Sequence, residues 1–188
     1  LRLVQHDLKL EIARILIRIL QGFGMKVVAY DLYPDEKYAR EVGISYVSLD
    51  SLYAQADMIS LHVPLTDQTK NMIDAQSIAK MKEGTIIINT SRGQLIHTNA
   101  LIEGLKSKKI AAAGLDVYEE EEGYFYEDQS DKIIDDDVLA RLLSFNNVIV
   151  TSHQGFFTEE ALTNIAETTL QNAEAFRTGM ELKNEIYL

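Results

Sequence analysis

The chain alternates between short apolar segments rich in valine and isoleucine and longer segments with apolar residues at helical spacing. Short β-branched runs are typical of strands that a sheet buries on both faces. They predict strands at residues 25–31, 58–62, 85–89, 111–116 and 147–151. Helical spacing predicts helices at residues 35–42, 49–55, 74–81, 98–107 and 136–143. Such alternation predicts an α/β fold with a doubly wound, mostly parallel sheet.

Two longer helices are predicted near the ends of the chain. The first covers residues 8–21 and carries on one face Ile12, Ile15, Leu16, Ile19 and Leu20. The last covers residues 158–178, where Thr158 precedes two glutamates, as a helix N-terminus prefers. Residues 1–11 are polar and helical in character, so no buried strand is expected there.

Composition narrows the class of protein. The 188 residues are 46% hydrophobic and 25% charged, as in an ordinary globular protein. No apolar run approaches the roughly 20 residues that cross a bilayer, and Arg2 and Asp7 interrupt any signal-peptide core. The net charge of -11 argues against nucleic acid or an anionic membrane as a partner. The absence of cysteine excludes thiolate chemistry and suits a reducing cytoplasm, and no metal site is expected.

Asp31 ends the first predicted strand. In a dinucleotide-binding sheet, a carboxylate there hydrogen-bonds the adenosine ribose and selects NAD, although an aspartate after a strand is more often a turn former. The preceding helix and Gly22-Phe23-Gly24 have the length expected of a βαβ unit. The glycine-rich turn is absent, because its three glycine slots hold Leu8, Leu10 and Ala13, of which only Ala13 is small. A weakened pyrophosphate cradle is therefore expected.

Three successive strands each bring a candidate catalytic side chain to their carboxyl ends. Arg92 lies in Asn-Thr-Ser-Arg-Gly after the strand at 85–89, where Gly93 permits a tight turn. Glutamates at 119–121 follow the next strand, and His153 follows the one after it. An arginine suits bidentate capture of a carboxylate. Each residue alone has an ordinary structural explanation, but three at one sheet edge indicate an active site.

These motifs resemble those of the D-isomer-specific 2-hydroxyacid dehydrogenases, from about Ala13 to the C-terminus. The motifs are N-T-S-R-G at 89–93, G-L-D-V-Y-E at 114–119 and T-S-H-Q-G-F at 151–156. The segments at 124–130 and 134–138, and the ending at 160–162 and 168–172, are similar to the fermentative D-lactate dehydrogenase branch. The resemblance implies a Rossmann-like fold, NAD as cofactor, and pyruvate and D-lactate, or another 2-oxoacid pair, as substrates.

The resemblance also implies catalytic roles. Arg92 would hold the substrate carboxylate and polarise the keto group. His153, as imidazolium, would donate a proton to the carbonyl oxygen while NADH delivers hydride, and it would be the general base in reverse. Glu121 would hydrogen-bond and orient His153, as a carboxylate does beside a catalytic imidazole. Glu119 and Glu120 compete for that role, and the spacing from Asp116 favours Glu121.

Cofactor contacts follow from the same matching. Val63 and Pro64 would line the adenosine and ribose side, and Asp116 would lie near the nicotinamide amide. The full expected set is Ile12, Asp31, Val63, Pro64, Thr69, Thr90, Ser91, Arg92 and Asp116. His97 stands where relatives usually have an aspartate that caps the next helix, a task that Thr98 can share.

The family fold has two lobes. Residues 1–157 would be the NAD-binding domain, with its first strand and glycine loop missing or altered, and residues 158–188 would belong to the otherwise absent substrate domain. A homodimer through the NAD-binding domain is expected by the same analogy. The altered cradle and missing lobe predict negligible activity for this chain.

Three hypotheses remain open. The chain is a piece of a working dehydrogenase, or a folded and inactive remnant that dimerises or binds nucleotide weakly. A different α/β domain, of receiver or flavodoxin type, would leave the arginine, glutamate and histidine arrangement unexplained.

Overall fold

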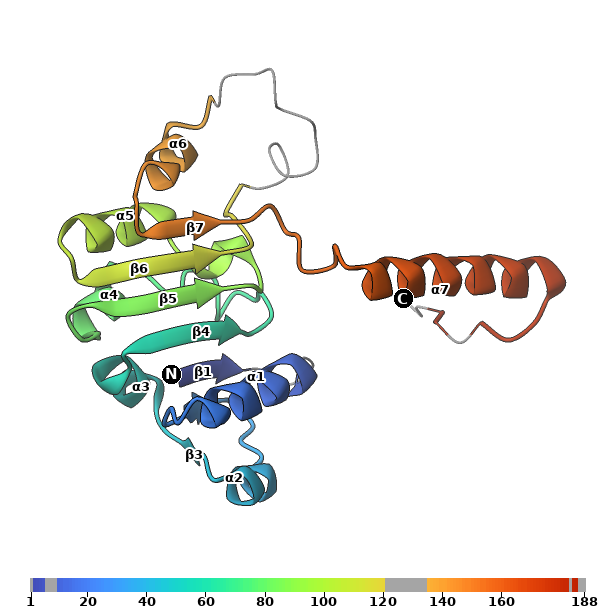
Figure 1. Cartoon of the computed structure of the whole chain (residues 1–188), viewed down its shortest axis with the longest axis horizontal. Helices are drawn as coiled ribbons and strands as arrows, with labels where there is room; N and C mark the ends of the chain where they lie inside the picture. Colours follow the sequence, from blue (N-terminus) through green and yellow to red (C-terminus); the bar gives the residue numbers. More distant parts are fainter. Residues whose placement is uncertain (1, 6–9, 121–134, 183, 186–188) are drawn as a thin grey trace. The chain divides into compact units, whose positions relative to one another are not determined.

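A parallel sheet forms the core of the computed structural model, which describes residues 2–5, 10–120, 135–182 and 184–185. The described strands are β1 (Arg2–Gln5), β2 (Val28–Tyr30), β3 (Ser45–Tyr46), β4 (Met58–His62), β5 (Thr85–Asn89), β6 (Ile110–Leu115) and β7 (Val148–Val150). Their order across the sheet is β3-β2-β1-β4-β5-β6-β7, with every described pair parallel (Figure 1). The doubly wound α/β fold is thus confirmed. The order reverses direction between β1 and β4, and open α/β sheets bind ligands at such a point.

The strand β1 corrects the expectation that no strand precedes the first helix. Leu3 pairs with Ala29 of β2 on one side and with Ser60 of β4 on the other. The four residues at 2–5 are half polar, so their sequence pattern gives little indication of a buried strand. Both backbone edges of β1 are nevertheless satisfied by neighbouring strands, and this pairing comes from tertiary structure rather than from local preference.

The helices alternate with the strands as the pattern predicts. Asp35, Ser48, Asp74 and Asp136 each cap a helix by accepting a backbone N–H. Such caps satisfy the donors that a helix N-terminus leaves unpaired. The helices are α1 (Leu10–Gly22), α2 (Glu36–Val42), α3 (Leu49–Gln55), α4 (Ala75–Lys80), α5 (Thr98–Lys106), α6 (Asp137–Leu143) and α7 (Glu159–Thr178), with a 3-10 turn η1 at Gly93–Leu95.

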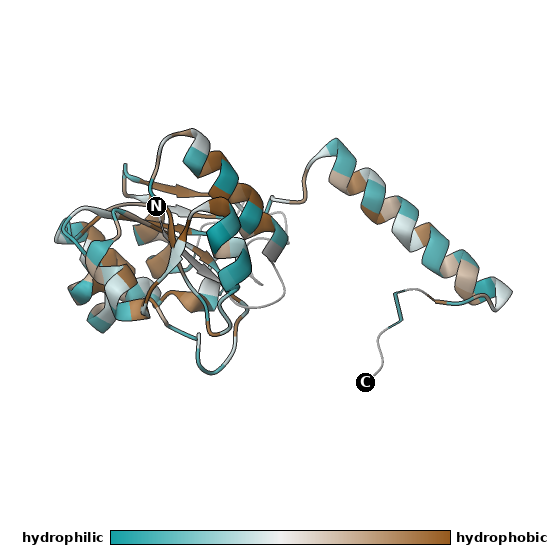
Figure 2. Cartoon of the chain, turned by 90° about the horizontal axis from the view of Figure 1, so that it is seen from below, coloured by the Kyte–Doolittle hydropathy of each residue, from teal (hydrophilic) through white to brown (hydrophobic). Residues whose placement is uncertain are grey.

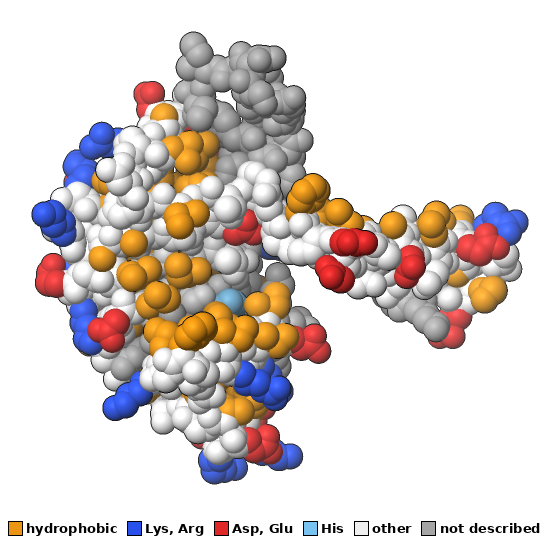
Figure 3. Space-filling model, viewed as in Figure 1, with side chains coloured by type: hydrophobic (Ala, Val, Ile, Leu, Met, Phe, Trp, Pro, Cys, Tyr) orange, Lys and Arg blue, Asp and Glu red, His pale blue; other side chains and the backbone are white. Residues whose placement is uncertain are grey.

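The helix α1 buries only part of the predicted apolar face: Leu20 lies in the core and Leu16 packs against it. Ala13, Ile17 and Leu20 are buried against β2 and α2 residues, whereas Ile12, Ile15 and Ile19 are 50–59% exposed. Ala13 is fully buried, which fits the close packing expected at its slot. Hydrophobic side chains therefore gather over α1 on the surface (Figure 3). The small residue decides the orientation, because its side lets the helix approach the sheet most closely.

Two buried clusters cover the sheet, so that helices lie on both of its faces (Figure 2). One cluster joins α1 and α2, and the larger one joins α3 to α6, with Leu52, Ile59, Ile87 and Leu142 fully buried. A shallow groove of about 730 Å³ lies between α4 and α5. No described helix combines the length and apolar character needed to span a bilayer.

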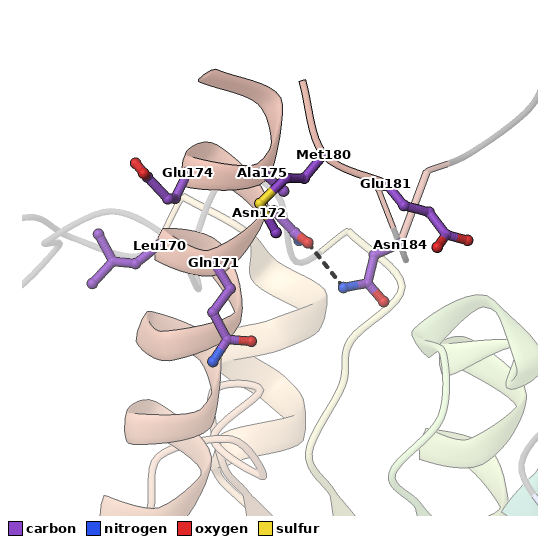
Figure 4. A pocket seen from close by; sticks show the side chains of 8 residues that line it. All are labelled: Leu170, Gln171, Asn172, Glu174, Ala175, Met180, Glu181 and Asn184. Carbon is purple, nitrogen blue, oxygen red and sulfur yellow. Dashed lines mark hydrogen bonds between the residues drawn. The ribbon is translucent and has the colours of Figure 1, made fainter. Parts of the chain in front are cut away.

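A second compact unit, Gln154–Leu188, follows the sheet unit Leu1–His153. Its helix α7 begins where the sequence predicts, and Thr158 Oγ1 accepts from Ala161 N (3.2 Å). None of the residues of α7 is buried. The end of the helix and the following tail enclose a pocket of about 470 Å³, across which Asn184 Nδ2 donates to Asn172 Oδ1 (3.0 Å; Figure 4).

His62 makes the stability of the sheet unit dependent on pH. It is 5% exposed at the end of β4, and burial lowers its pKa to about 4. The unfolded chain binds this proton near pH 6.5, so the stabilising contribution is complete above that pH and is lost as pH falls toward 4. We predict that, between pH 7 and 4, the wild type loses roughly 3 kcal/mol more unfolding free energy than His62→Gln. Urea unfolding of both proteins measures this, and parallel pH profiles would contradict it.

Candidate active site at the carboxyl edge of the sheet

Asn89 shapes the turn that carries Arg92. Its side chain is 1% exposed; Oδ1 accepts from Ser91 N (3.0 Å) and Nδ2 donates to Arg92 O (2.8 Å). Ser91 Oγ then donates to Leu61 O (3.1 Å), which ties the turn to the end of β4. The turn after β5 is therefore held by buried polar contacts at both ends.

Arg92 leaves this turn in extended backbone conformation, and its side chain is exposed. Nη1 donates to Ser91 O (2.7 Å), which uses one of the five donors of a guanidinium. Thr90, beside it, is also exposed. Both residues lie at the carboxyl edge, where the sequence predicts them.

Backbone hydrogen bonds join the next two strand ends to this turn. Asp116 N donates to Asn89 O (2.9 Å), and His153 N donates to Asp116 O (2.8 Å). The ladder of β5, β6 and β7 thus continues past the strands. It places Arg92, Asp116 and His153 on three adjacent loops of one edge, as the sequence predicts.

The glutamate expected to orient His153 lies outside the described residues, because the description ends at residue 120 and resumes at 135. Its competitor Glu119 has another task. Glu119 Oε2 accepts from Thr98 Oγ1 (2.9 Å) and Thr98 N (3.3 Å) at the start of α5. This use of Glu119 leaves Glu121 as the stronger prediction for the role beside His153.

The ends of the segment that carries Glu121 are joined by Tyr118 and Asp136. The hydroxyl of Tyr118 donates to Asp136 Oδ2 (2.6 Å). Burial raises the pKa of Tyr118, and the bond to the carboxylate raises it further, so the phenol stays a donor at neutral pH. Asp136 Oδ1 meanwhile caps α6.

His97 caps α5 itself, which corrects the expectation that Thr98 shares this task. The imidazole Nδ1 accepts from Ala100 N (3.2 Å). An unprotonated ring nitrogen can replace a carboxylate as the acceptor at a helix N-terminus. The hydroxyl of Thr98 donates to Glu119 instead.

The residues predicted for the adenosine side lie at or near the ends of β2, β4 and α1. Asp31 follows β2, is partly exposed, and accepts from Tyr33 N through Oδ1 (2.8 Å). Val63 is 3% exposed within the larger core cluster, whereas Pro64 is exposed. Ile12 is exposed on the first turn of α1.

Thr69 closes the loop after β4. It is 8% exposed. Its hydroxyl donates to Pro64 O (2.6 Å), and its own Oγ1 also accepts from Thr66 N (2.8 Å). These bonds give Thr69 a loop-closing role. Of the glycine slots, position 8 lies outside the described residues and Leu10 begins α1.

Sequence reasoning missed Asn89 and Thr151 as parts of this site. Thr151 Oγ1 donates to Asp116 Oδ1 (2.5 Å) across the ends of β6 and β7. The available signal was a polar residue that directly ends an apolar strand, at positions where turn residues are also common.

This edge can be compared with known proteins. The sequence profile of the D-isomer specific 2-hydroxyacid dehydrogenase, NAD binding domain, matches residues 11–155. The chain belongs to this family. Its assignment from the three motifs is thus confirmed, together with the α/β architecture of the family.

Individual relatives include the D-lactate dehydrogenase of Escherichia coli, 47% identical over 91% of this chain and 52% of that protein. An aromatic 2-oxoacid reductase of Clostridium sporogenes is 51% identical over 92% of this chain and 53% of its own length. Among solved structures, a D-lactate dehydrogenase with NAD+ from Lactobacillus jensenii has a TM-score of 0.86 at 33% identity and covers all of this chain and 56% of its own. The chain spans about half the length of these relatives.

Gly93 is required by close packing rather than by an unusual turn. A Cβ there would lie 1.9 Å from Tyr118 O, so the loop after β5 touches the backbone of the loop after β6. We predict that Gly93→Ala lowers the unfolding free energy by about 3 kcal/mol or more, because backbone on both sides must shift. Gly22→Ala is the matched control, since its Cβ would meet nothing within 4 Å. Equal stability of the two variants in urea unfolding would refute this explanation.

Proposed function

We propose that this chain is the NAD-dependent oxidoreductase domain of an enzyme that interconverts a 2-oxoacid and its D-2-hydroxyacid. The observation that supports this most directly is the hydrogen-bonded series Asn89–Asp116–His153. It holds Arg92 and His153 at the same edge of the sheet, on the loops either side of the one that carries Asp116. A cation that binds carboxylates and an imidazole that transfers protons are the two groups that 2-oxoacid reduction requires at one edge.

The described residues fit NAD chemically at two parts of the cofactor, the adenosine ribose and the nicotinamide half. The partly exposed Asp31 carboxylate after β2 suits ribose hydroxyls, and Thr90, Ser91 and Asp116 suit the nicotinamide half. Ile12, Val63, Pro64 and Thr69 complete the proposed cofactor side. When bound, NADH supplies the hydride.

Within this scheme, each catalytic residue has a separate task. Arg92 binds the substrate carboxylate and polarises the keto oxygen with its positive charge. His153 donates its proton to that oxygen and accepts it in the reverse direction. Glu121 holds the orientation of the His153 ring.

Pyruvate and D-lactate are the proposed pair. The names of the relatives support a 2-oxoacid substrate. They also indicate that the substrate differs between relatives, since they include D-lactate dehydrogenase and aromatic 2-oxoacid reductase. A 2-oxoacid of either kind presents to Arg92 the same carboxylate and keto group.

Residues 158–188 are proposed to belong with the substrate domain of the family, and residues 1–157 with the NAD-binding domain. The match of the NAD-binding domain model to residues 11–155, which ends just before residue 158, supports this division. A homodimer through the NAD-binding domain is part of the same proposal. Ile15 and Ile19 on α1, and Phe23 just after it, are 50–79% exposed and offer an apolar surface for it. A cytoplasmic location stays a prediction from the cysteine-free composition.

An alternative function is a non-catalytic module that dimerises or binds nucleotide weakly. The sequence observation in its favour is that leucines occupy the first two glycine slots, at positions 8 and 10. Glycines at these slots let backbone N–H groups approach the pyrophosphate in a dinucleotide-binding turn. NADH affinity separates the two functions.

We predict that this chain binds NADH weakly and that Leu8→Gly/Leu10→Gly tightens binding by about tenfold or more, equivalent to about 1.4 kcal/mol. The double variant restores the first two glycines of the turn that cradles the pyrophosphate. Lys9→Gly is the control, because it adds backbone freedom within the same segment without placing a glycine in a glycine slot. A fluorescence titration with NADH gives the dissociation constants, and equal values for all three proteins would count against an impaired cradle.

We further predict that the 188-residue chain has negligible pyruvate-dependent NADH oxidation. The weakened cradle leaves too little bound cofactor beside Arg92 and His153. Absorbance at the NADH band in the presence of pyruvate measures the rate. Turnover at ordinary enzyme rates of about 1–1000 per second would show that the chain is a competent enzyme by itself.

A further inference from the structure

His153 adopts a backbone conformation that residues with a side chain seldom use. Its φ is 53°, in the left-handed region, where Cβ approaches the backbone. Such a residue keeps this conformation only where surrounding contacts determine it. The contacts that hold the backbone of His153 therefore determine the position from which its side chain projects.

Two carbonyl oxygens accept hydrogen bonds from the backbone N–H of His153. His153 N donates to Asp116 O (2.8 Å) and to Thr151 O (3.1 Å). One acceptor lies in the loop after β6 and the other in the turn after β7. The turn can therefore close correctly only if these two loops keep their mutual position.

Thr151 links the same two loops. Its amide donates to Leu115 O (2.8 Å), and its hydroxyl donates to Asp116 Oδ1 (2.5 Å). The backbone and side chain of Thr151 thus bind two consecutive residues, the last of β6 and the first of the loop that follows it. The hydroxyl bond is charge-assisted, because its acceptor is a carboxylate, and such bonds are stronger than neutral ones.

We propose that Thr151 is a positioning residue of the active site, whose hydroxyl locks the loop after β7 onto Asp116 and so fixes His153 in its left-handed turn. The same bond directs the Asp116 carboxylate, which lies on the proposed nicotinamide side. This role rests on the proposed function, since it matters for catalysis only if His153 transfers the proton.

Thr151 can be tested without disturbing the fold. Its side chain is exposed at the end of β7, and valine has the same shape and an equal preference for strands. Thr151→Val thus removes the donor alone, and Thr151→Ser restores it. Thr85→Val is the matched control, because Thr85 Oγ1 donates to Ala56 O (3.2 Å) and Lys82 O (3.0 Å) at the opposite end of the sheet.

The experiment is amide hydrogen exchange by NMR on the ¹⁵N-labelled 188-residue chain. In Thr151→Val we expect the His153 amide to exchange about tenfold faster or more, as for loss of a hydrogen bond to a charged group. The Ala113 amide, which donates to Asn147 O (3.1 Å) between β6 and β7, should be unchanged. Thr151→Ser and Thr85→Val should keep the exchange rate of His153 at the wild-type value.

Three results would overturn the proposal: an unprotected His153 amide in the wild type, unchanged exchange in Thr151→Val, or equal acceleration in Thr85→Val. The measurement uses no cofactor. Failure of the chain to bind NADH would therefore count against the proposed function alone, and unchanged exchange would count against the role of Thr151 alone.

Discussion

The candidate site depends on backbone hydrogen bonds that continue the ladder of β5, β6 and β7 into the loops after these strands. The amide of Asp116 binds the carbonyl of Asn89, and the amide of His153 binds the carbonyl of Asp116. Parallel strands bring their carboxyl ends to one edge, but the loops beyond them usually diverge. Here two hydrogen bonds keep three loops in register. Arg92 and His153 are distant in sequence, and these bonds hold the loops that carry them at one edge of the sheet.

Close packing between the loops after β5 and β6 reinforces these backbone hydrogen bonds. Gly93 lies against the backbone of Tyr118, and Glu119 binds the first turn of α5. These contacts join the loops after β5 and β6 to the helix between them. The side chains needed for chemistry can then stay exposed, because buried polar groups and backbone hold the loops. The left-handed conformation of His153 has a free-energy cost of about 1–2 kcal/mol, which this framework must offset.

Most of the fold could be predicted from the sequence because the strands at Met58–His62 and Thr85–Asn89 are apolar, β-branched and bounded by polar residues. The strand at Arg2–Gln5 could not, since its pairing with two neighbours is a tertiary effect that four residues do not encode locally. The buried face of α1 was predicted only in part because large apolar residues occupy more than one side of the helix. Motifs identified Arg92 and His153, whereas Asn89 and Thr151 act through hydrogen bonds that only the folded edge creates.

We infer that the carboxyl edge of the sheet is the cofactor side of this domain, even though the glycine turn is altered. Its most direct test is NMR mapping of the ¹⁵N-labelled chain at high NADH concentration. We expect the shift changes to concentrate at the amides of Asp31, Thr90, Asp116 and His153. Changes concentrated instead in the groove between α4 and α5, or in the pocket beside α7, would contradict it, and so would the absence of any change.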